Sequence, residues 1–572
     1  MTLDLDAVDE LFAREFAQGR SPGLVYAVVR DGEILHTGAH GTTRLGEETA
    51  PDVTSVHRIA SMTKSFTAAA ILLLRDRGRL WLDDPVAAYL PELVGSEITL
   101  RHLLTMSGGL ITDDPWGDRN ESMTAAALGE FLRGGFRTGA VPGTTFEYAN
   151  LGYALLGRVI EVLTGDYHRF VLEELAGPLG MTATKYDAHD VGPALVPGHH
   201  KVASGWVVQP TNSPGAFSAM GGLHSSVADL ARWVAGFTDA FRRPAAAHPL
   251  PASSRREMQQ LQRFVEVSSS ICLDPPPAGR ALTGVATGYG FGLFAEHDGD
   301  QGQVVQHSGG YPGYGSHMRW HPETGLGVIA LANGTYAGPV STAEKALRLL
   351  VAGERSRDLP PSLPPALIER VTRWLAGEDE DDLFTDNVAR DMPEAERRAE
   401  LARAAALVGE PRPDGEPVVF ADGHAFALWP VPAERGRYVL EIKVAPTPQP
   451  KVQWLVVTGV PDPPEPLLAH ARAVVAAIAD GWPVDVPLAP GVDLGAFGRA
   501  ATTLRALAGP APGEVTLRDP IEGDGESSAV WGVRAGTTWW RLAITGTDPV
   551  TELSLTPVPT EEYAEFDVRF GS

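Results

Sequence analysis

The sequence predicts an α+β protein in which a sheet, interrupted by a mostly helical insertion, is followed by a smaller α+β region. Strand-like segments occur near the start of the chain and again between residues 289 and 334, and the stretch between them, about 80–240, is mostly helical and loop in pattern. A sheet interrupted by a helical insertion follows from that order. A Pro-rich stretch, Asp358 to Pro365, then precedes a region in which helical segments and strand-like runs alternate twice.

The N-terminal elements follow from the spacing of apolar residues. Helical periodicity predicts a helix from about Leu5 to Gln18, and the runs LVYAVV and EILHTGA, separated by Arg30-Asp31-Gly32, predict a β-hairpin. Apolar positions recur at helical spacing from Arg58 to Asp76, and Gly78 is a plausible end of that helix.

The second group of strands lies between glycines. The expected strands are YGFGLF (289–294), GQVVQHSGG (302–310), GSHMRWH (315–321) and GLGVIALANG (325–334). Two segments that are rich in Pro and small residues, 242–254 and 274–280, are expected to be surface insertions with little regular structure.

We expect three regions along the chain: a first domain over 1–355, a linker over 356–365 and a C-terminal α+β region over 366–572. In that last region, helices precede strands twice, so we expect two related subdomains, with an internal duplication as a hypothesis. The first set comprises helices Ala366–Gly377 and Glu394–Val408 and strands Val418–Phe420, Tyr438–Val444 and Val452–Val457. The second comprises helices Leu467–Ala479 and Leu494–Ala508 and strands Val530–Val533, Trp539–Ile544 and Glu552–Leu555.

Composition limits the classes of function. Apolar residues make up 44% of the chain and charged residues 21%, and the formal charge is −25, without a block rich in Lys or Arg. Nucleic acid and anionic membrane surfaces are therefore poor partners. The first residues lack the pattern of a secretory signal and no stretch of 18 apolar residues occurs, so we expect a cytoplasmic protein without a membrane span. Cys272 is the only cysteine, which excludes internal disulfides and a cysteine-rich metal site.

Ser61-Met62-Thr63-Lys64 supplies a nucleophile and a base for acyl transfer. At positions i and i+3 of a helix, the hydroxyl and the amine lie on one face. Burial disfavours the charged amine and lowers its pKa, so that Lys64 can accept the proton of Ser61. The motif is so short that it indicates a catalytic serine only in combination with further motifs.

Two further sequence motifs complete the predicted active site. Tyr148-Ala149-Asn150 is the only Tyr-x-Asn in the chain; its phenol can relay a proton to a leaving group, and its amide can orient both lysine and substrate. His307-Ser308-Gly309-Gly310 ends a strand-like run, where the glycines allow a substrate to lie along the strand and the backbone N–H of Gly310 can join that of Ser61 as an oxyanion hole.

Taken in order, these motifs resemble those of the serine β-lactamases and penicillin-recognising enzymes. LDDPVAAYLPEL, ITLRHLLTMSGGL, PGTTFEYANLGYALLG and GGLHSSVADLARW resemble the class C β-lactamase branch and its D-aminopeptidase and esterase relatives over about residues 5–350. The resemblance implies a β-lactamase/transpeptidase-like fold for the first domain, which is an antiparallel sheet flanked by helices with a mostly helical insertion. It also implies that Ser61 is acylated, that Lys64 and Tyr148 act as general base and acid, and that Asn150 positions substrate.

One position departs from the family pattern. His307 occupies the place of the strand lysine that favours the carboxylate of β-lactams and of C-terminal D-amino acids, and a histidine can be uncharged near neutrality. The sequence therefore favours a serine hydrolase of small esters, amides or short peptides, esterase- or D-aminopeptidase-like. The alternatives are a penicillin-binding D,D-carboxypeptidase or β-lactamase, and a catalytically inactive binding module.

Two rival chemistries fail on the residues. Gly19-Arg20-Ser21-Pro22-Gly23 matches the nucleophile motif of α/β-hydrolases, but Pro22 lacks the N–H that their oxyanion hole requires. His-Glu-x-x-His is absent, and His199-His200 is typical of a surface pair, so we expect neither metal nor cofactor.

The C-terminal region is expected to narrow the active-site cleft or to mediate a homo-oligomer.

Overall fold

The computed structural model describes residues 3–269, 284–298, 301–355, 364–378, 382–412, 419–422, 425–480, 486–508, 515–536 and 538–559. These residues form two compact units, one up to residue 355 and one from residue 364 onward, and each is considered by itself. Cys272, the insertion expected at 274–280 and most of the linker expected at 356–365 lie outside the described residues, and Pro365 is the first residue of a helix.

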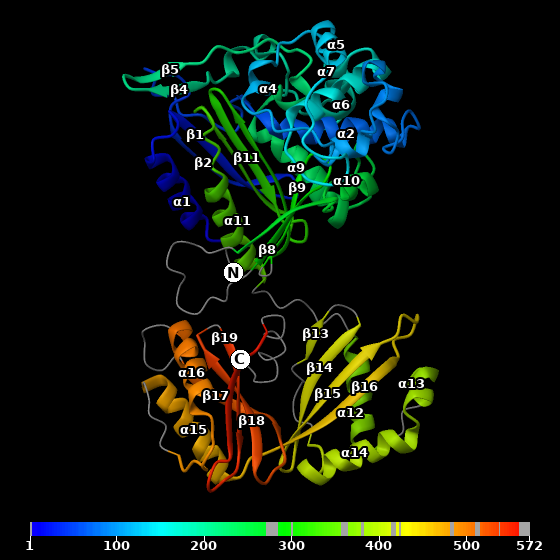
Figure 1. The fold of residues 1–572 in the computed structure, drawn as a ribbon, viewed down its shortest axis with the longest axis vertical. Helices are drawn as coiled ribbons and strands as arrows, with labels where there is room; N and C mark the ends of the chain where they lie inside the picture. Colours follow the sequence, from blue (N-terminus) through cyan, green and yellow to red (C-terminus); the bar gives the residue numbers. More distant parts are fainter. Residues whose placement is uncertain are drawn as a thin grey trace. The chain divides into compact units, whose positions relative to one another are not determined.

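The first unit is built on one eight-stranded sheet (Figure 1). All neighbouring strands pair antiparallel, and the order across the sheet is β2-β1-β12-β11-β10-β9-β8-β7. The strands are β1 (Gly23–Arg30), β2 (Glu33–Gly41), β7 (Arg263–Ser269), β8 (Gly284–Tyr289), β9 (Phe294–Asp298), β10 (Gly302–Tyr311), β11 (Tyr314–Trp320) and β12 (Leu326–Ala332).

Helices cover both faces of this sheet. Strand β1 is buried along almost its whole length, because Val25, Ala27 and Val29 face one core while Leu24 and the next even-numbered residues face the other. The terminal helices α1 (Leu5–Ala17) and α11 (Val340–Arg355) pack on the second face, and α2 (Thr63–Asp76) and α9 (Val227–Arg242) pack on the first. The two ends of this unit therefore meet on one side of the sheet (Figure 1).

The insertion between β2 and β7 is mostly helical, as predicted. It also contains two two-stranded pairs, β3 (His57–Arg58) with β6 (His224–Ser225) and β4 (His199–Val202) with β5 (Gly205–Val208). Its other α-helices are α3 (Leu100–Leu104), α4 (Trp116–Arg119), α5 (Ala125–Gly134), α6 (Asn150–Thr164), α7 (Tyr167–Val171), α8 (Ser218–Gly221) and α10 (Ala252–Met258).

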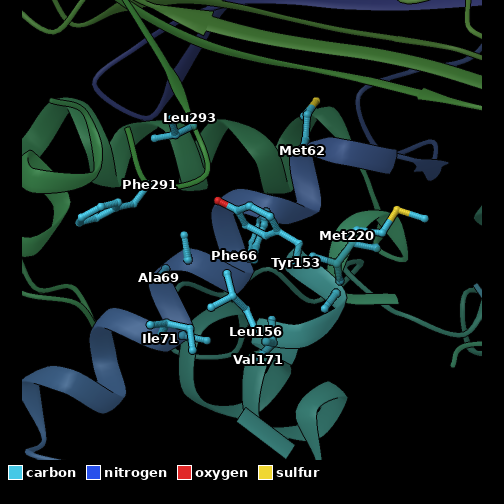
Figure 2. Packing of buried hydrophobic residues seen from close by; sticks show 14 of the residues in the cluster. Met62, Phe66, Ala69, Ile71, Tyr153, Leu156, Val171, Met220, Phe291 and Leu293 are labelled. Atoms are coloured by element: carbon cyan, nitrogen blue, oxygen red, sulfur yellow. The ribbon is translucent and has the colours of Figure 1, made fainter. Parts of the chain in front are cut away.

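Helix α2 lies in the centre of this insertion, and twelve of its fourteen residues are buried. Figure 2 shows Phe66 and Ala69 of α2 among side chains from α6, α7 and the β8–β9 connection. A helix that is apolar around its whole circumference is held by neighbours on every side. The start of α2, which directly follows the turn that carries the predicted nucleophile, is therefore rigidly placed.

The second unit contains two four-stranded antiparallel sheets, each with its own apolar core. The first set comprises α12 (Pro365–Leu375), α13 (Asp386–Asp391), α14 (Glu394–Val408), β13 (Phe420–Asp422), β14 (Phe426–Ala433), β15 (Gly436–Val444) and β16 (Val452–Pro461). The second comprises α15 (Glu465–Asp480), α16 (Leu494–Ala508), β17 (Val515–Gly523), β18 (Ser528–Ala535), β19 (Thr538–Thr545) and β20 (Glu552–Pro557).

The two sets bury equivalent positions. The first helix of each set buries residues at the same spacing: Leu367, Val371, Trp374 and Leu375 in α12, and Leu467, Ala471, Val474 and Val475 in α15. A parallel bridge joins Phe384 to Val452 in the first set and Leu488 to Val550 in the second. We propose that the sets arose by duplication of one helix-helix-sheet unit; among the described residues, α13 has no counterpart in the second set.

Several expected elements differ in detail. The β1–β2 turn is at Asp31-Gly32, both with positive φ (50° and 89°), as a two-residue hairpin turn requires. The helix expected from Arg58 begins only at Thr63, because 57–58 pair with β6 and 60–62 form a 3₁₀ turn. The strand expected over 289–294 is instead the β8–β9 connection, and the expected loop at 242–254 ends in α10. No described helix is long and apolar enough to span a bilayer.

Buried histidines predict acid sensitivity of the first unit. Burial lowers the pKa of His57 to about 4 and that of His224 to about 3, whereas an unfolded histidine titrates near 6.5. The unfolded state then binds more protons below about pH 6.5, so their stabilisation is complete above that pH and is lost as pH falls toward 4. We expect the melting temperature to fall by about 5 °C or more between pH 7.5 and 4.5.

Calorimetry at a series of pH values checks this expectation. The His224→Gln variant should show a shallower dependence over the same range, because it removes one titrating group. A melting temperature that stays constant or rises on acidification would contradict the assignment of neutral buried histidines.

Candidate active site

Ser61 lies in the 3₁₀ turn Ala60–Met62 that connects β3 to α2. Ala60 has a positive φ of 47°, a conformation that costs free energy for a residue with a Cβ and that persists only where the surroundings impose it. The preceding Ile59 supplies that constraint: its N–H donates to the carbonyl of Leu223 (2.9 Å), and its carbonyl accepts from Ser316 Oγ (2.8 Å). The turn is thus fixed between the sheet and the β6 segment, with the Ser61 side chain partly exposed.

Lys64 is completely buried and its amine contacts three oxygen acceptors. Nζ lies 3.0 Å from Ser61 Oγ, 2.7 Å from Asn150 Oδ1 and 2.8 Å from the carbonyl of Met220 in α8. Burial lowers the pKa of Lys64 to about 8, against the opposing effect of nearby carboxylates, of which Asp114 acts most strongly. About a tenth of Lys64 is therefore a neutral amine at pH 7, and about half at pH 8.

Asn150 is the first residue of α6 and orients the amine. Its Oδ1 accepts from Lys64, and its Nδ2 donates to Asp114 Oδ1. Asp113 caps the same helix: Oδ1 accepts from the backbone N–H of Asn150 (2.7 Å) and Oδ2 from that of Leu151 (2.8 Å). Both ends of the Asn150 amide are thus occupied by protein groups, an arrangement suited to positioning Lys64 rather than to free contact with substrate.

Tyr148 precedes α6 and lies beside the reacting groups. Lys64 Nζ is 4.8 Å from the centroid of its ring, and its hydroxyl interacts with that of Ser61. Burial raises the pKa of Tyr148 well above its usual value, an effect that the Ser61 interaction only partly offsets. The phenol therefore keeps its proton at neutral pH.

His307 lies in β10 with its ring buried and both nitrogens in contact with protein groups. Nδ1 is 2.6 Å from the carbonyl of Ser308, which requires a proton on Nδ1, and Nε2 is then the acceptor for the Tyr289 hydroxyl at 3.2 Å. Burial, reinforced by the charge of Lys64, lowers the pKa of His307 to about 3. His307 is a neutral residue of the site wall.

The three residues after His307 have different positions. Ser308 pairs across the sheet with His317, and its hydroxyl contacts His317 Nδ1 at 2.9 Å, whereas the neighbouring Ser316 faces Ile59. Because side chains alternate along a strand, Ser308 points to the face opposite Ser61. The substrate-binding role predicted for Ser308 is therefore corrected: only its backbone can serve substrate.

Gly309 allows β10 to approach the nucleophile turn. A Cβ at Gly309 would lie 2.1 Å from the carbonyl oxygen of Ile59, whereas one at Gly310 would meet only the Tyr336 ring, at 2.7 Å. Beyond Gln306, β10 has no strand partner on its second side among the described residues, since its pairing with β9 ends there. Substrate can lie along this edge, next to the predicted oxyanion-hole N–H of Gly310.

The structure also identifies residues that the sequence reasoning missed. Asp113 and Asp114 hold α6 and Asn150, and the run ITDDPWGD before a helix start was their only signal. The carbonyl of Met220 had no signal, because any residue type supplies one. Asp118 lies beneath Tyr336, whose hydroxyl donates to Asp118 Oδ2 at 2.7 Å, and burial raises the pKa of Asp118 to about 6.

No group of three or more described His, Cys, Asp and Glu side chains is arranged to hold a metal ion. The expectation of a surface histidine pair at 199–200 is wrong for His199, which is fully buried in β4 with Nδ1 3.3 Å from the carbonyl of Asn333.

A serine hydroxyl bonded to a buried lysine three residues further on, beside the edge of an antiparallel sheet, is the arrangement of the class of serine hydrolases that includes the penicillin-recognising enzymes. The chain belongs to the β-lactamase family, whose model matches residues 8–353. It is 26% identical over 346 residues to protein Flp of Staphylococcus aureus strain N315; that match covers 57% of this chain and 62% of Flp, so less than two thirds of the relative is represented.

Two further comparisons agree with this assignment. The chain is 27% identical over 339 residues to the D-alanyl-D-alanine-carboxypeptidase/endopeptidase AmpH of Escherichia coli K12, covering 57% of this chain and 83% of AmpH. An octameric penicillin-binding protein homologue from Pyrococcus abyssi shares the fold, with a TM-score of 0.53, 19% identity and coverage of 96% of this chain and 97% of that one. The expected fold and family are confirmed.

The close approach at Gly309 predicts a difference between two glycines of the same sheet. Gly309→Ala should displace β10 from Ile59, lower the melting temperature and slow labelling of Ser61 by a fluorophosphonate at least about tenfold, because a shift near 1 Å is costly in such sites. Gly284→Ala, at the start of β8, is the control, because a Cβ there meets no atom within 4 Å. Equal effects of the two substitutions would contradict this account of the β10–Ile59 contact.

Proposed function

We propose that the protein is a serine hydrolase that forms an acyl-enzyme on Ser61 and acts on small esters or amides, with an esterase- or D-aminopeptidase-like preference. The observation that carries the proposal is the set of three hydrogen-bond partners of the Lys64 amine. When the amine is neutral, its two N–H bonds can still donate to Asn150 Oδ1 and to the Met220 carbonyl, which directs the remaining lone pair toward Ser61 Oγ at 3.0 Å.

The proton path follows from the two pKa shifts. Neutral Lys64 takes the proton of Ser61 as Oγ attacks the substrate carbonyl, and the backbone N–H groups of Ser61 and Gly310 stabilise the resulting oxyanion. Tyr148, which retains its proton, donates it to the leaving group and recovers one from Lys64. In deacylation the same groups act in reverse on a water molecule, so that atoms and protons balance over the cycle.

The charges around the site support a substrate without a carboxylate next to the scissile bond. His307 is neutral and both of its ring nitrogens are engaged, so it does not supply the positive charge that a strand lysine would supply. Asp114 and Asp118 both act electrostatically on Lys64. Carboxylates that act on Lys64 also act on a substrate at Ser61: they repel an anionic substrate and tolerate a neutral or cationic one.

A D,D-carboxypeptidase or β-lactamase activity is the second candidate, favoured by the similarity to AmpH. It would require the substrate carboxylate to bind backbone N–H groups of β10 without a cation at 307. Cytoplasmic location and assembly through the C-terminal region stay predictions; the octameric state belongs to the Pyrococcus protein.

Replacement of the nucleophile tests the proposal. Hydrolysis by Ser61→Ala should fall by several orders of magnitude relative to the wild type, because the covalent route is removed. The assay is a panel of p-nitrophenyl esters, D- and L-amino acid anilides and nitrocefin. Mass spectrometry of the intact protein detects the adduct on Ser61. A wild type that neither turns over nor labels would favour a binding module, and a penicilloyl adduct would favour the second candidate.

The pKa of Lys64 predicts the pH dependence of that hydrolysis. Because the base must be neutral, kcat/KM for a p-nitrophenyl ester should rise through pH 7 and level off above its pKa of about 8. A stopped-flow profile from pH 6 to 9.5 measures it. A profile that falls over this range would show that the charged amine is the active form and would exclude Lys64 as the base.

A further inference from the structure

A buried ion pair lies directly behind the catalytic groups. Arg58, in β3, and Glu121, in the segment between α4 and α5, are each 1% exposed and form a salt bridge. Removing two charges from water is expensive, and replacing such a pair by apolar residues often leaves stability unchanged or improves it. Stability alone therefore does not explain an ion pair at this position.

Arg58 connects β3, which precedes the turn with Ser61, to the segment of α8 that binds the Lys64 amine. Its Nε donates to the carbonyl of Gly221 at 3.1 Å. The adjacent carbonyl, that of Met220, is one of the three acceptors of the Lys64 amine. A displacement of Gly221 would move the Met220 oxygen with it, since the two carbonyls belong to consecutive residues.

The same pair also fixes the end of β10. The Arg58 guanidinium lies 3.7 Å from the centroid of the Tyr311 ring, and the Tyr311 hydroxyl donates to Glu121 Oε2 at 2.7 Å. Tyr311 directly follows Gly310, whose N–H is the proposed oxyanion donor. Arg58 and Glu121 thus contact both the residue next to the oxyanion donor and the residue next to the lysine acceptor.

We propose that Arg58 and Glu121 are positioning residues for acyl transfer: together they set the distance between the amine of Lys64 and the oxyanion edge of β10. The inference rests on the proposed function of the site. The pair does not touch substrate and acts through Gly221 and Tyr311. Its loss should therefore lower kcat while KM changes little, because misplaced groups weaken the transition state more than the ground state.

The test replaces both charges at once in the full chain, as Arg58→Met with Glu121→Met, so that no buried charge is left unpaired. The expected result with p-nitrophenyl acetate is a decrease in kcat on the order of 10- to 100-fold, a KM within about threefold of the wild type and an unaltered melting temperature. Arg58→Lys, which keeps a cation for Glu121, should restore part of the loss.

A matched control comes from a second, largely buried ion pair, Arg319 with Glu296. Their side chains are 5% and 14% exposed and lie on the face of the eight-stranded sheet opposite Ser61, where Glu296 also accepts from Gln306. Arg319→Met with Glu296→Met should retain kcat. An equal loss in this control, or a kcat within about twofold of wild type in the Arg58 and Glu121 double variant, would overturn the proposal.

A further variant keeps the result decisive if the double variant fails to fold. Tyr311→Phe retains the ring but removes the hydroxyl, which bonds Glu121, the carbonyl of Asp118 and the amide of Asn212. It should lower kcat with KM unchanged, and an unchanged kcat in Tyr311→Phe would overturn the proposal. A wild type without Ser61-dependent hydrolysis would instead refute the proposed function, so the two failures are distinguishable.

Discussion

Burial of one amine is the constraint on which the site depends. Lys64 is surrounded by apolar residues of α2 and α6, and its three hydrogen-bond partners come from three separate segments of the chain. A buried amine without partners would be costly in either protonation state. The 3₁₀ turn, the start of α6 and α8 must therefore stay in register with α2 for the chain to be stable at all, and catalytic geometry follows from that requirement.

A second constraint is the distance between the sheet and the nucleophile turn. Gly309 lets the backbone of β10 approach Ile59, and Ser316 Oγ closes the contact from the neighbouring strand. The sheet is continuous from β12 through β11 to β10, so its core fixes where the free edge of β10 lies relative to Ser61. The apolar packing on both faces thus determines the position of the substrate edge.

The sequence predicted most elements because their patterns are local. Alternation defined the β1–β2 hairpin and helical spacing defined α14 and α16 to the residue. Errors arose where tertiary pairing overrides local pattern: the apolar periodicity of α2 extends back to Ile59, but the adjacent Arg58 pairs as a strand with His224. Aromatic residues at 289 and 294 suggested one strand, although a tight connection separates two.

For the site, the motifs identified the groups with distinctive chemistry but not those that act through the backbone or through charge. Ser61, Lys64, Tyr148 and His307 are brought together, whereas the Met220 carbonyl and the side-chain direction of Ser308 depend on the fold. The sequence predicted that burial lowers the pKa of Lys64, but it could not predict how large that effect is. Whether Lys64 is a base depends on the balance between burial, which lowers its pKa, and the carboxylates of Asp113, Asp114 and Asp118, which raise it. Those carboxylates keep the amine titrating near neutrality, where it can both accept and return a proton within one cycle.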